Sequence, residues 1–234
     1  MDKVNRITSW LKQTYGERPA VIGVSGGVDS AVALSLLTRA LGKDKVIPVL
    51  LPYGDQDMMD AKAIVGWNDV TNKTIEINIK EIVDTMAGQI GATVERVRVG
   101  NIMARVRMIV VFDMAKKMGA LVCGTENKSE HKLGYYTRFG DSASDVEPIA
   151  GLYKTEVWEM AKEMGLPEIF YTKKPSAGLW DGQTDEGEMG FTYQQADLVL
   201  QGKSEGVEPK IVEKVKRMVE ANKFKLEVPY TFDF

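Results

Sequence analysis

Short runs of β-branched and other apolar residues alternate along this chain with longer stretches in which apolar positions recur every three or four residues. The short runs predict strands over 20–24, 46–51, 74–79 and 120–123. Such an alternation is typical of crossover helices that cover both faces of a parallel sheet. It predicts an α/β protein with a Rossmann-like, doubly wound parallel sheet of about five strands and helices on both faces.

The helices are indicated by apolar residues on one face and by glycines at their ends. The opening helix, which we expect to cover the sheet, is predicted by Val4, Ile7, Trp10, Leu11 and Tyr15. A helix near the C-terminus is predicted in the same way by Ile211, Val212, Val215, Met218 and Val219. Two more are expected over 29–41 and about 101–118, and they end at Gly42 and Gly119 because glycine readily adopts the left-handed conformation.

A different region lies between residues 173 and 190, where the chain reads KKPSAGLWDGQTDEGEMG. Its glycines, acidic residues and turn formers predict a long loop that is ordered by itself or by a ligand. Loops of this length in compact domains usually carry function. The residues after Pro229 predict an irregular tail.

The charge and the lengths of the apolar stretches exclude some classes of partner. Thirty basic and 33 acidic residues leave a formal charge of −3, which gives no general attraction for nucleic acid or an anionic membrane. Residues 1–10 include four polar or charged residues in the first six positions, and no stretch reaches membrane-spanning length. We therefore expect one cytoplasmic domain over 1–234, with neither nucleic acid nor a membrane as its partner.

The chain has a single cysteine, Cys123, and a single histidine, His131. They exclude an internal disulfide and leave too few soft ligands for a structural zinc site, whereas oxygen-ligated metals stay possible. Cys123 ends a predicted buried strand, which favours a quiet core residue over a nucleophile paired with His131. For His131 we expect a local structural or surface role.

The sharpest motif follows the first predicted strand and opens a predicted helix. It consists of Gly23, Val24, Ser25, Gly26, Gly27, Val28, Asp29 and Ser30. Glycine amides can turn toward a phosphate, and a helix N-terminus adds unpaired N–H groups and the positive end of its dipole. Asp29 suits a ligand that brings Mg²⁺ to phosphate oxygens. The motif is neither a Walker loop nor a dinucleotide fingerprint, and the alternative interpretation is a plain glycine turn with a capping Asp.

SGGVDS at 25–30 resembles the pyrophosphate loop of the N-type ATP pyrophosphatases, which include NAD, GMP and argininosuccinate synthetases. Further stretches are similar, in order along nearly the whole chain, to the ammonia-dependent NAD synthetases. They are LPYG at 51–54, GNIMARVRM at 100–108, GTENKSE at 124–130, GYYTRFGD at 134–141, LYKT at 152–155, KPSA at 174–177 and QTDE at 183–186. The resemblance implies an adenine nucleotide alpha hydrolase-like version of the predicted fold.

The resemblance also implies a site for ATP and Mg²⁺. The motif at 23–30 would hold ATP together with Thr125, Lys154 and Ser176. Asp29 and Glu130 would bind Mg²⁺, and these two carboxylates with Lys154 would carry the catalysis. Carboxylates suit a hard cation and lysine supplies a mobile charge, whereas an exposed glutamate or lysine is also common without any function.

For the substrate deamido-NAD, the resemblance implies contacts with Arg105, Arg138 and Asp145, and with Phe224 and Lys225 near the C-terminus. Guanidinium groups suit a pyrophosphate or a carboxylate, although an arginine on a long helix, such as Arg105, is more often a surface residue. Where the family commonly has His-Lys-Arg before proline, this chain reads FKLEVP at 224–229. The His and Arg positions therefore differ, which indicates altered affinity or a related dinucleotide-like substrate.

The implied reaction has two steps. The nicotinate carboxylate of deamido-NAD attacks the α-phosphate of ATP and releases pyrophosphate, and ammonia then displaces AMP to give NAD. One alternative is another amidating ATP pyrophosphatase, acting for example on nicotinate mononucleotide or as the ATPase half of a GMP synthetase. Another is a non-catalytic nucleotide sensor. The resemblance also implies a homodimer and a chain without a glutaminase domain, supplied by free ammonia or by a separate partner protein.

Overall fold

The computed structural model describes residues 2–176, 178 and 182–226. Within these residues, four parallel strands form one sheet in the order β3-β2-β1-β4. They are β1 (Ala20–Gly23), β2 (Val46–Leu50), β3 (Ile75–Glu76) and β4 (Leu121–Cys123). Each of them lies inside a predicted strand, and β3 is much shorter than expected.

The predicted sheet of about five strands has four in the described part of the chain. The next position at the β4 edge is held by a single parallel bridge between Cys123 and Val146. The Gly124 N–H donates to the Val146 carbonyl at 2.9 Å, as in a parallel ladder. The following donor in that ladder would be residue 148, and Pro148 has no N–H, so the pairing stops after one bridge.

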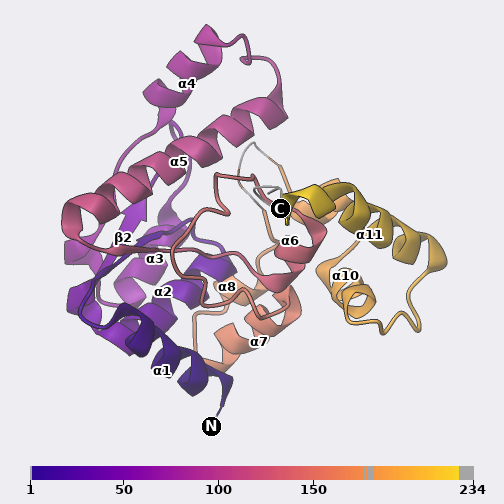
Figure 1. Ribbon diagram of the computed structural model, residues 1–234, viewed down its shortest axis with the longest axis horizontal. Coiled ribbons are helices and arrows are strands. Elements are labelled where there is room, and N and C mark those ends of the chain that lie inside the picture. The colour runs from indigo at the N-terminus through magenta and orange to yellow at the C-terminus, as the bar shows by residue number, and fades with distance from the viewer. Residues whose placement is uncertain (1, 177, 179–181, 227–234) are drawn as a thin grey trace, which may run out of the picture.

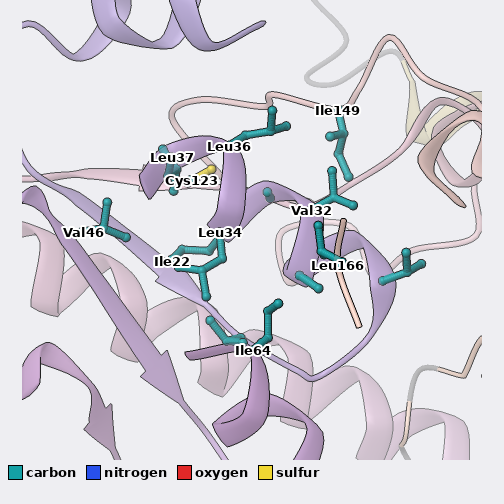
Figure 2. Packing of buried hydrophobic residues seen from close by; sticks show 14 of the residues in the cluster. Ile22, Val32, Leu34, Leu36, Leu37, Val46, Ile64, Cys123, Ile149 and Leu166 are labelled. Atoms are coloured by element: carbon teal, nitrogen blue, oxygen red, sulfur yellow. The ribbon is translucent and has the colours of Figure 1, made fainter. Parts of the chain in front are cut away.

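One face of the sheet is covered by α2 (Val28–Leu41), and α1 (Lys3–Tyr15) packs on α2 (Figure 1). The other helices on this side are α3 (Met59–Trp67), α7 (Lys154–Glu163) and α8 (Ile169–Thr172). Figure 2 shows this core, in which Ile22 and Cys123 of the sheet lie among leucines of α2. The opening helix therefore covers α2 rather than the sheet, and Trp10, expected on its buried face, is 44% exposed.

The opposite face is covered by the long helix α5 (Arg96–Met118), with α4 (Lys80–Gln89) packed against it at the outer edge of the molecule (Figure 1). In β1, Val21 belongs to the core under α5, while Ala20 and Ile22 belong to the core under α2. Such burial on both faces explains the near-continuous apolar runs of the sequence, and it confirms the doubly wound arrangement.

A smaller core joins the C-terminal helices to the sheet domain. Its helices are α6 (Lys128–Leu133), α9 (Asp185–Met189), α10 (Tyr193–Leu200) and α11 (Pro209–Asn222). The remaining elements are the 3₁₀ turns η1 (Lys43–Lys45), η2 (Thr71–Lys73) and η3 (Lys223–Lys225). The predicted loop at 173–190 thus ends in a short helix, α9, which Thr184 caps by accepting from the Gly187 N–H. The irregular tail expected after Pro229 lies outside the described residues.

The predicted helix ends at glycines are confirmed. α2 ends at Gly42 and α5 at Gly119, which has a φ of 63°. In the described part of the chain, no helix combines the length and the apolar character needed to cross a membrane.

Candidate nucleotide and metal site

The strand order reverses beside β1, whose neighbours are β2 on one side and β4 on the other. In open α/β sheets, ligands bind outside the carboxyl ends of the strands at such a switch point. The motif at 23–30 follows β1, and the stretch at 124–130 follows β4. Two of the stretches selected from the sequence therefore meet at the position where this fold binds ligands.

The turn after β1 depends on a glycine. Gly26 has a φ of 84°, and a Cβ atom there would lie 2.8 Å from the Ala61 backbone nitrogen. Gly27 is the N-cap of α2 and makes no side-chain cap, so the helix start can face an anion. The hydroxyls of Ser25 and Ser30 lie 3.2 Å apart beside it. The local geometry suits an anion, and Asp29, the capping residue in the plain-turn alternative, does not cap the helix.

Asp29 instead points toward the segment after β4 and the start of α7. The Lys154 ammonium donates to Asp29 Oδ2 at 2.5 Å and to Glu130 Oε1 at 3.0 Å. The Asn127 side-chain amide donates to Asp29 Oδ1 at 2.9 Å. Residues from β1–α2, α6 and α7 thus converge on one buried cation, and the lysine side chain is only 3% exposed. The structure brings together all three predicted catalytic side chains.

Burial and charge act in opposite directions in this group. Burial alone would lower the pKa of Lys154, but Asp29 and Glu130 outweigh it, so the pKa is raised and the ammonium stays charged. Burial raises the pKa of Glu130, and the charge of Lys154 opposes that rise. A buried charge group of this kind persists only when its members are paired, so the three side chains depend on one another.

The residues that hold the group in place were not predicted from the sequence. Asn127 caps α6 and accepts from the N–H groups of Ser129 and Glu130 at 3.0 Å each. Ser129 Oγ accepts from the Lys154 N–H at 2.9 Å and donates to Asp197 on α10. The Asn127-x-x-Glu130 spacing is a capping signature that could have been found in the sequence, whereas nothing local marks Asp197.

Tyr193 contacts the same group from α10. Its hydroxyl donates to Asp185 Oδ2 at 3.1 Å and lies 3.4 Å from Glu130 Oε1. The Lys154 ammonium lies 5.0 Å from the centre of its ring. Asp185 opens α9, so Tyr193 links the end of the long loop to the carboxylate group.

A cavity of about 590 Å³ lies beyond the carboxyl ends of β2 and β3. Its lining includes Gln56, Met58 and Lys62. The cavity lies close to the glycine turn, because Ala61, the neighbour of Lys62, contacts Gly26. The half-buried Arg107 donates from Nη2 to Gln56 Oε1 at 2.9 Å, and burial lowers its pKa to about 10. Arg107 therefore helps to hold Gln56 in the wall of the cavity, and the volume of the cavity is within the range of small-molecule sites.

The long loop reaches this cavity. The Gln56 side-chain amide donates to the Gly178 carbonyl at 3.2 Å, and Lys173 pairs with Asp60. Ser176, predicted to touch ATP, is exposed and accepts from the Gly178 N–H at 3.1 Å. Thr125 lies in the turn between β4 and α6. Ser176 therefore lies next to Gly178, which contacts the lining of the cavity, and Thr125 follows the carboxyl end of β4.

The predicted substrate residues form a second, more exposed group. Arg105 on α5 donates to the Arg138 carbonyl at 3.2 Å. The Arg138 guanidinium carbon lies 5.1 Å from the centre of the Phe139 ring and 5.3 Å from that of Phe224. Asp145 Oδ2 accepts from the Val122 N–H of β4 at 2.8 Å. Arg105, Arg138 and Phe224 are therefore brought together, and the Asp145 carboxylate lies at the edge of the sheet.

Lys225 contacts the turn that carries Arg138. Its ammonium donates to the carbonyl oxygens of Gly134 at 2.5 Å and Tyr136 at 2.9 Å. The neighbouring Asn222 donates to the Leu133 carbonyl at 3.0 Å. The C-terminal segment thus ties down the end of α6 and the turn after it.

Cys123 and His131 do not form a nucleophile pair. Cys123 is buried, burial raises the pKa of its thiol, and its Sγ donates to the Gly124 carbonyl. His131 is exposed, with Nδ1 at 3.0 Å from Glu126 Oε1. The interpretation of a core cysteine and a surface histidine agrees with this geometry.

The fold and the turn at its switch point define a doubly wound α/β protein with a glycine turn after its first strand whose geometry suits an anion. Within that class, the family model described as NAD synthase matches residues 3–229. The chain belongs to the NAD synthase family.

Known relatives agree with this assignment over most of the chain. The NH(3)-dependent NAD(+) synthetase of Pyrococcus furiosus is 43% identical, over 97% of this chain and 92% of the relative. Among solved structures, the NMN synthetase of Francisella tularensis is 33% identical with a TM-score of 0.90, covering 99% of this chain and 98% of that one. The NH3-dependent NAD synthetase of Campylobacter jejuni is 28% identical with a TM-score of 0.82, covering 100% of both chains.

Proposed function

We propose that the chain catalyses the ATP-dependent amidation of deamido-NAD by ammonia, with NAD, AMP and pyrophosphate as products. The supporting observation is the convergence of Asp29, Glu130 and Lys154 beside the glycine turn, in a member of the NAD synthase family. Such a group suits a reaction in which pyrophosphate leaves, because the departing charge needs cations. A protein that only bound nucleotides would need no buried charge group of this kind.

ATP would bind with its phosphates on the turn and its nucleoside in the cavity beside it. The amides near Gly26 and Gly27 would receive the β and γ phosphates, together with the hydroxyls of Ser25 and Ser30. Thr125 and Ser176 would approach the nucleotide from opposite sides. The α-phosphate would then be the point at which the carboxylate of the second substrate attacks.

Mg²⁺ suits the two carboxylates. In the described residues, no group of three or more His, Cys, Asp or Glu side chains converges to hold a metal. Mg²⁺ commonly uses one or two carboxylates and takes its other ligands from phosphates and water, so Asp29 and Glu130 would be sufficient. When bound, the metal neutralises charge on the departing pyrophosphate. Lys154 would hold a phosphate oxygen next to it.

The exposed group would bind the pyridine nucleotide. Arg105 and Arg138 suit its pyrophosphate or its carboxylate, and Phe224 offers an aromatic face next to Arg138. The Asp145 carboxylate, held by the β4 backbone, would meet the substrate at the edge of the sheet. No protein nucleophile is needed. We propose that ammonia attacks the acyl-adenylate without a glutaminase step within residues 1–234.

We further propose that the protein acts as a homodimer through the outer face of α4 and α5 (Figure 1). Ile82, Met86 and Ile90 recur every four residues there, and Ile82 is 49% exposed. On α5, Val97 and Ile109 are 66% and 59% exposed. Exposed apolar side chains on two neighbouring helices favour an interface there. Sedimentation equilibrium tests it, because Met86→Glu with Ile109→Glu should give a monomer.

A second candidate substrate is nicotinate mononucleotide. It is favoured by the similarity to the Francisella tularensis NMN synthetase, which has a TM-score of 0.90, and by Phe224 and Leu226 at the positions of the family's His and Arg. A smaller substrate would need fewer contacts from the C-terminal segment.

One experiment separates these possibilities. The protein is incubated with ATP, Mg²⁺ and ammonium, together with deamido-NAD, nicotinate mononucleotide or xanthosine monophosphate, and AMP and the amidated product are measured. NAD formation from deamido-NAD at the highest kcat/KM supports the proposal. Preference for the mononucleotide supports the second candidate. If no substrate stimulates AMP release, both are wrong and a nucleotide sensor is the better description.

A further inference from the structure

The ammonium of Lys154 lies at the position that a metal held by Asp29 and Glu130 would take. It contacts one oxygen of each carboxylate, at 2.5 and 3.0 Å. Asn127 contacts the other oxygens, through its side-chain amide on Asp29 at 2.9 Å and its backbone N–H on Glu130 at 3.5 Å. The protein's own cation therefore completes the pair of carboxylates.

We propose that Lys154 is a resident substitute for the metal, so that the site accepts a divalent cation only together with a nucleoside triphosphate. This inference rests on the proposed function, which brings metal and nucleotide to the same carboxylates. It assigns the lysine two successive partners, the carboxylates before the nucleotide binds and a phosphate afterwards.

In this arrangement, Mg²⁺ and the Lys154 ammonium cannot occupy the position between the two carboxylates at the same time. Mg²⁺ lies about 2.0–2.1 Å from its ligand oxygens, and an ammonium at hydrogen-bonding distance from the same oxygens would overlap it and repel it. Lys154 must therefore move before the metal can bind. Lys154 is the first residue of α7, and its backbone N–H donates to the Ser129 hydroxyl. The backbone is therefore held in place, and only the side chain has to move.

Movement of the Lys154 side chain to admit a metal alone is unfavourable. Its ammonium is buried, and a buried charge that loses its partners is strongly unfavourable. The ring of Tyr193, 5.0 Å away, compensates only in part. A triphosphate changes this balance, because its oxygens pair with the ammonium and also complete the coordination of the metal. Nucleotide and metal should therefore bind with strong positive coupling.

The test measures Mn²⁺, used as a paramagnetic probe for Mg²⁺, by electron paramagnetic resonance of the free ion. The probe is titrated with and without the α,β-methylene analogue of ATP, and no pyridine nucleotide is present. Wild type should bind Mn²⁺ weakly alone and tightly with the analogue. Lys154→Met should bind Mn²⁺ without nucleotide about tenfold tighter than wild type or more, because the competing charge is gone. Lys162→Met, an exposed lysine on the same helix, is the matched control and should behave as wild type.

A gain of metal affinity in an impaired enzyme is a result that a purely structural role for Lys154 does not give. Equal nucleotide-free affinities in Lys154→Met and wild type would overturn the proposal. So would tight Mn²⁺ binding by wild type without the analogue, a measurement that needs no variant if Lys154→Met fails to fold. Because neither titration contains a pyridine nucleotide, their result is independent of whether deamido-NAD proves to be the substrate.

Discussion

The two charged groups of this site differ in how they are held. Asp29, Glu130 and Lys154 are largely buried, and each contacts a charged partner from another element. Arg105 and Arg138 are more exposed, and their contacts in the protein are a backbone carbonyl and the faces of aromatic rings. In the proposed function, the buried group carries the chemistry of ATP and its contacts hold it in place. The exposed group is the one that we propose binds the second substrate.

The difference indicates where specificity can change within this fold. A substitution in the buried group leaves a charge unpaired in the interior and disturbs all its members. A substitution in the exposed group alters one contact and leaves the nucleotide side intact. The departure from the family pattern at Phe224 and Leu226 falls beside the exposed group, where it can alter the choice of pyridine nucleotide.

The largest effect is expected from Asp29→Asn, which keeps the size of the side chain and removes its charge. Turnover should fall by about 10²–10³, because one metal ligand is lost and Lys154 loses a partner. The measurement is AMP formation with saturating deamido-NAD, with circular dichroism to confirm folding. Asp113→Asn, on the exposed side of α5, should leave turnover unchanged. Full activity in Asp29→Asn would remove the basis of the buried group's proposed role.

In the exposed group, Arg138→Gln should change the KM for deamido-NAD rather than the turnover. The KM for deamido-NAD should rise by roughly tenfold to a hundredfold, which matches the loss of a hydrogen bond to a charged group. The KM for ATP should stay the same, because the glycine turn and cavity are untouched. Arg98→Gln, an exposed arginine in the first turn of α5, is the control. Equal changes in both KM values would show that the two groups are not separable.

The members of the buried group could be predicted from the sequence and the residues that support them could not, for a physical reason. The glycine turn proposed to bind phosphate is made by neighbouring residues, so its pattern, SGGVDS, can be found in the sequence alone. The supports of Lys154 come from Asn127, Ser129 and Asp197, and Asp197 lies 68 residues from Ser129 along the chain. Only the fold brings them together. The role of Lys225 against the Gly134 turn is equally long-range.

The same contrast applies to the fold. Helices α2 and α5 were predicted because their ends carry glycines and their periodicity is local. The described residues form four strands rather than about five, because Pro148 stops the pairing at the β4 edge after a single bridge. The prediction that Trp10 lies on the buried face of the opening helix was wrong. Periodicity indicates which residues share a helix face, but not how much of that face the neighbouring helix covers.

A smaller effect is expected at the contact between the C-terminal segment and the Arg138 turn. Gly134 has a φ of 63°, and a Cβ atom there would lie 2.3 Å from Asn222 Cβ. Gly119 has the same φ with no neighbouring atom within 4 Å, so it is a matched control. Both alanine variants should lose about 1 kcal/mol of stability from the left-handed conformation.

Beyond that shared loss, Gly134→Ala should lose further stability and raise the KM for deamido-NAD, because the tail must move off the turn. Thermal unfolding and the two KM values measure this. If the two variants were equally stable and equally active, the contact would not matter for the substrate.

The smallest effect is expected from Lys225→Met. The two carbonyl contacts of its ammonium hold the Arg138 turn, so their loss should raise the KM for deamido-NAD about two- to tenfold and leave kcat unchanged, as for one or two ordinary hydrogen bonds. Lys216→Met, an exposed lysine of α11, is the control. A loss as large as that of Arg138→Gln would mean that Lys225 itself pairs with the substrate. In that case the double variant Arg138→Gln with Lys225→Met should show additive losses, whereas a lysine that acts only through Arg138 should add little once that arginine is gone.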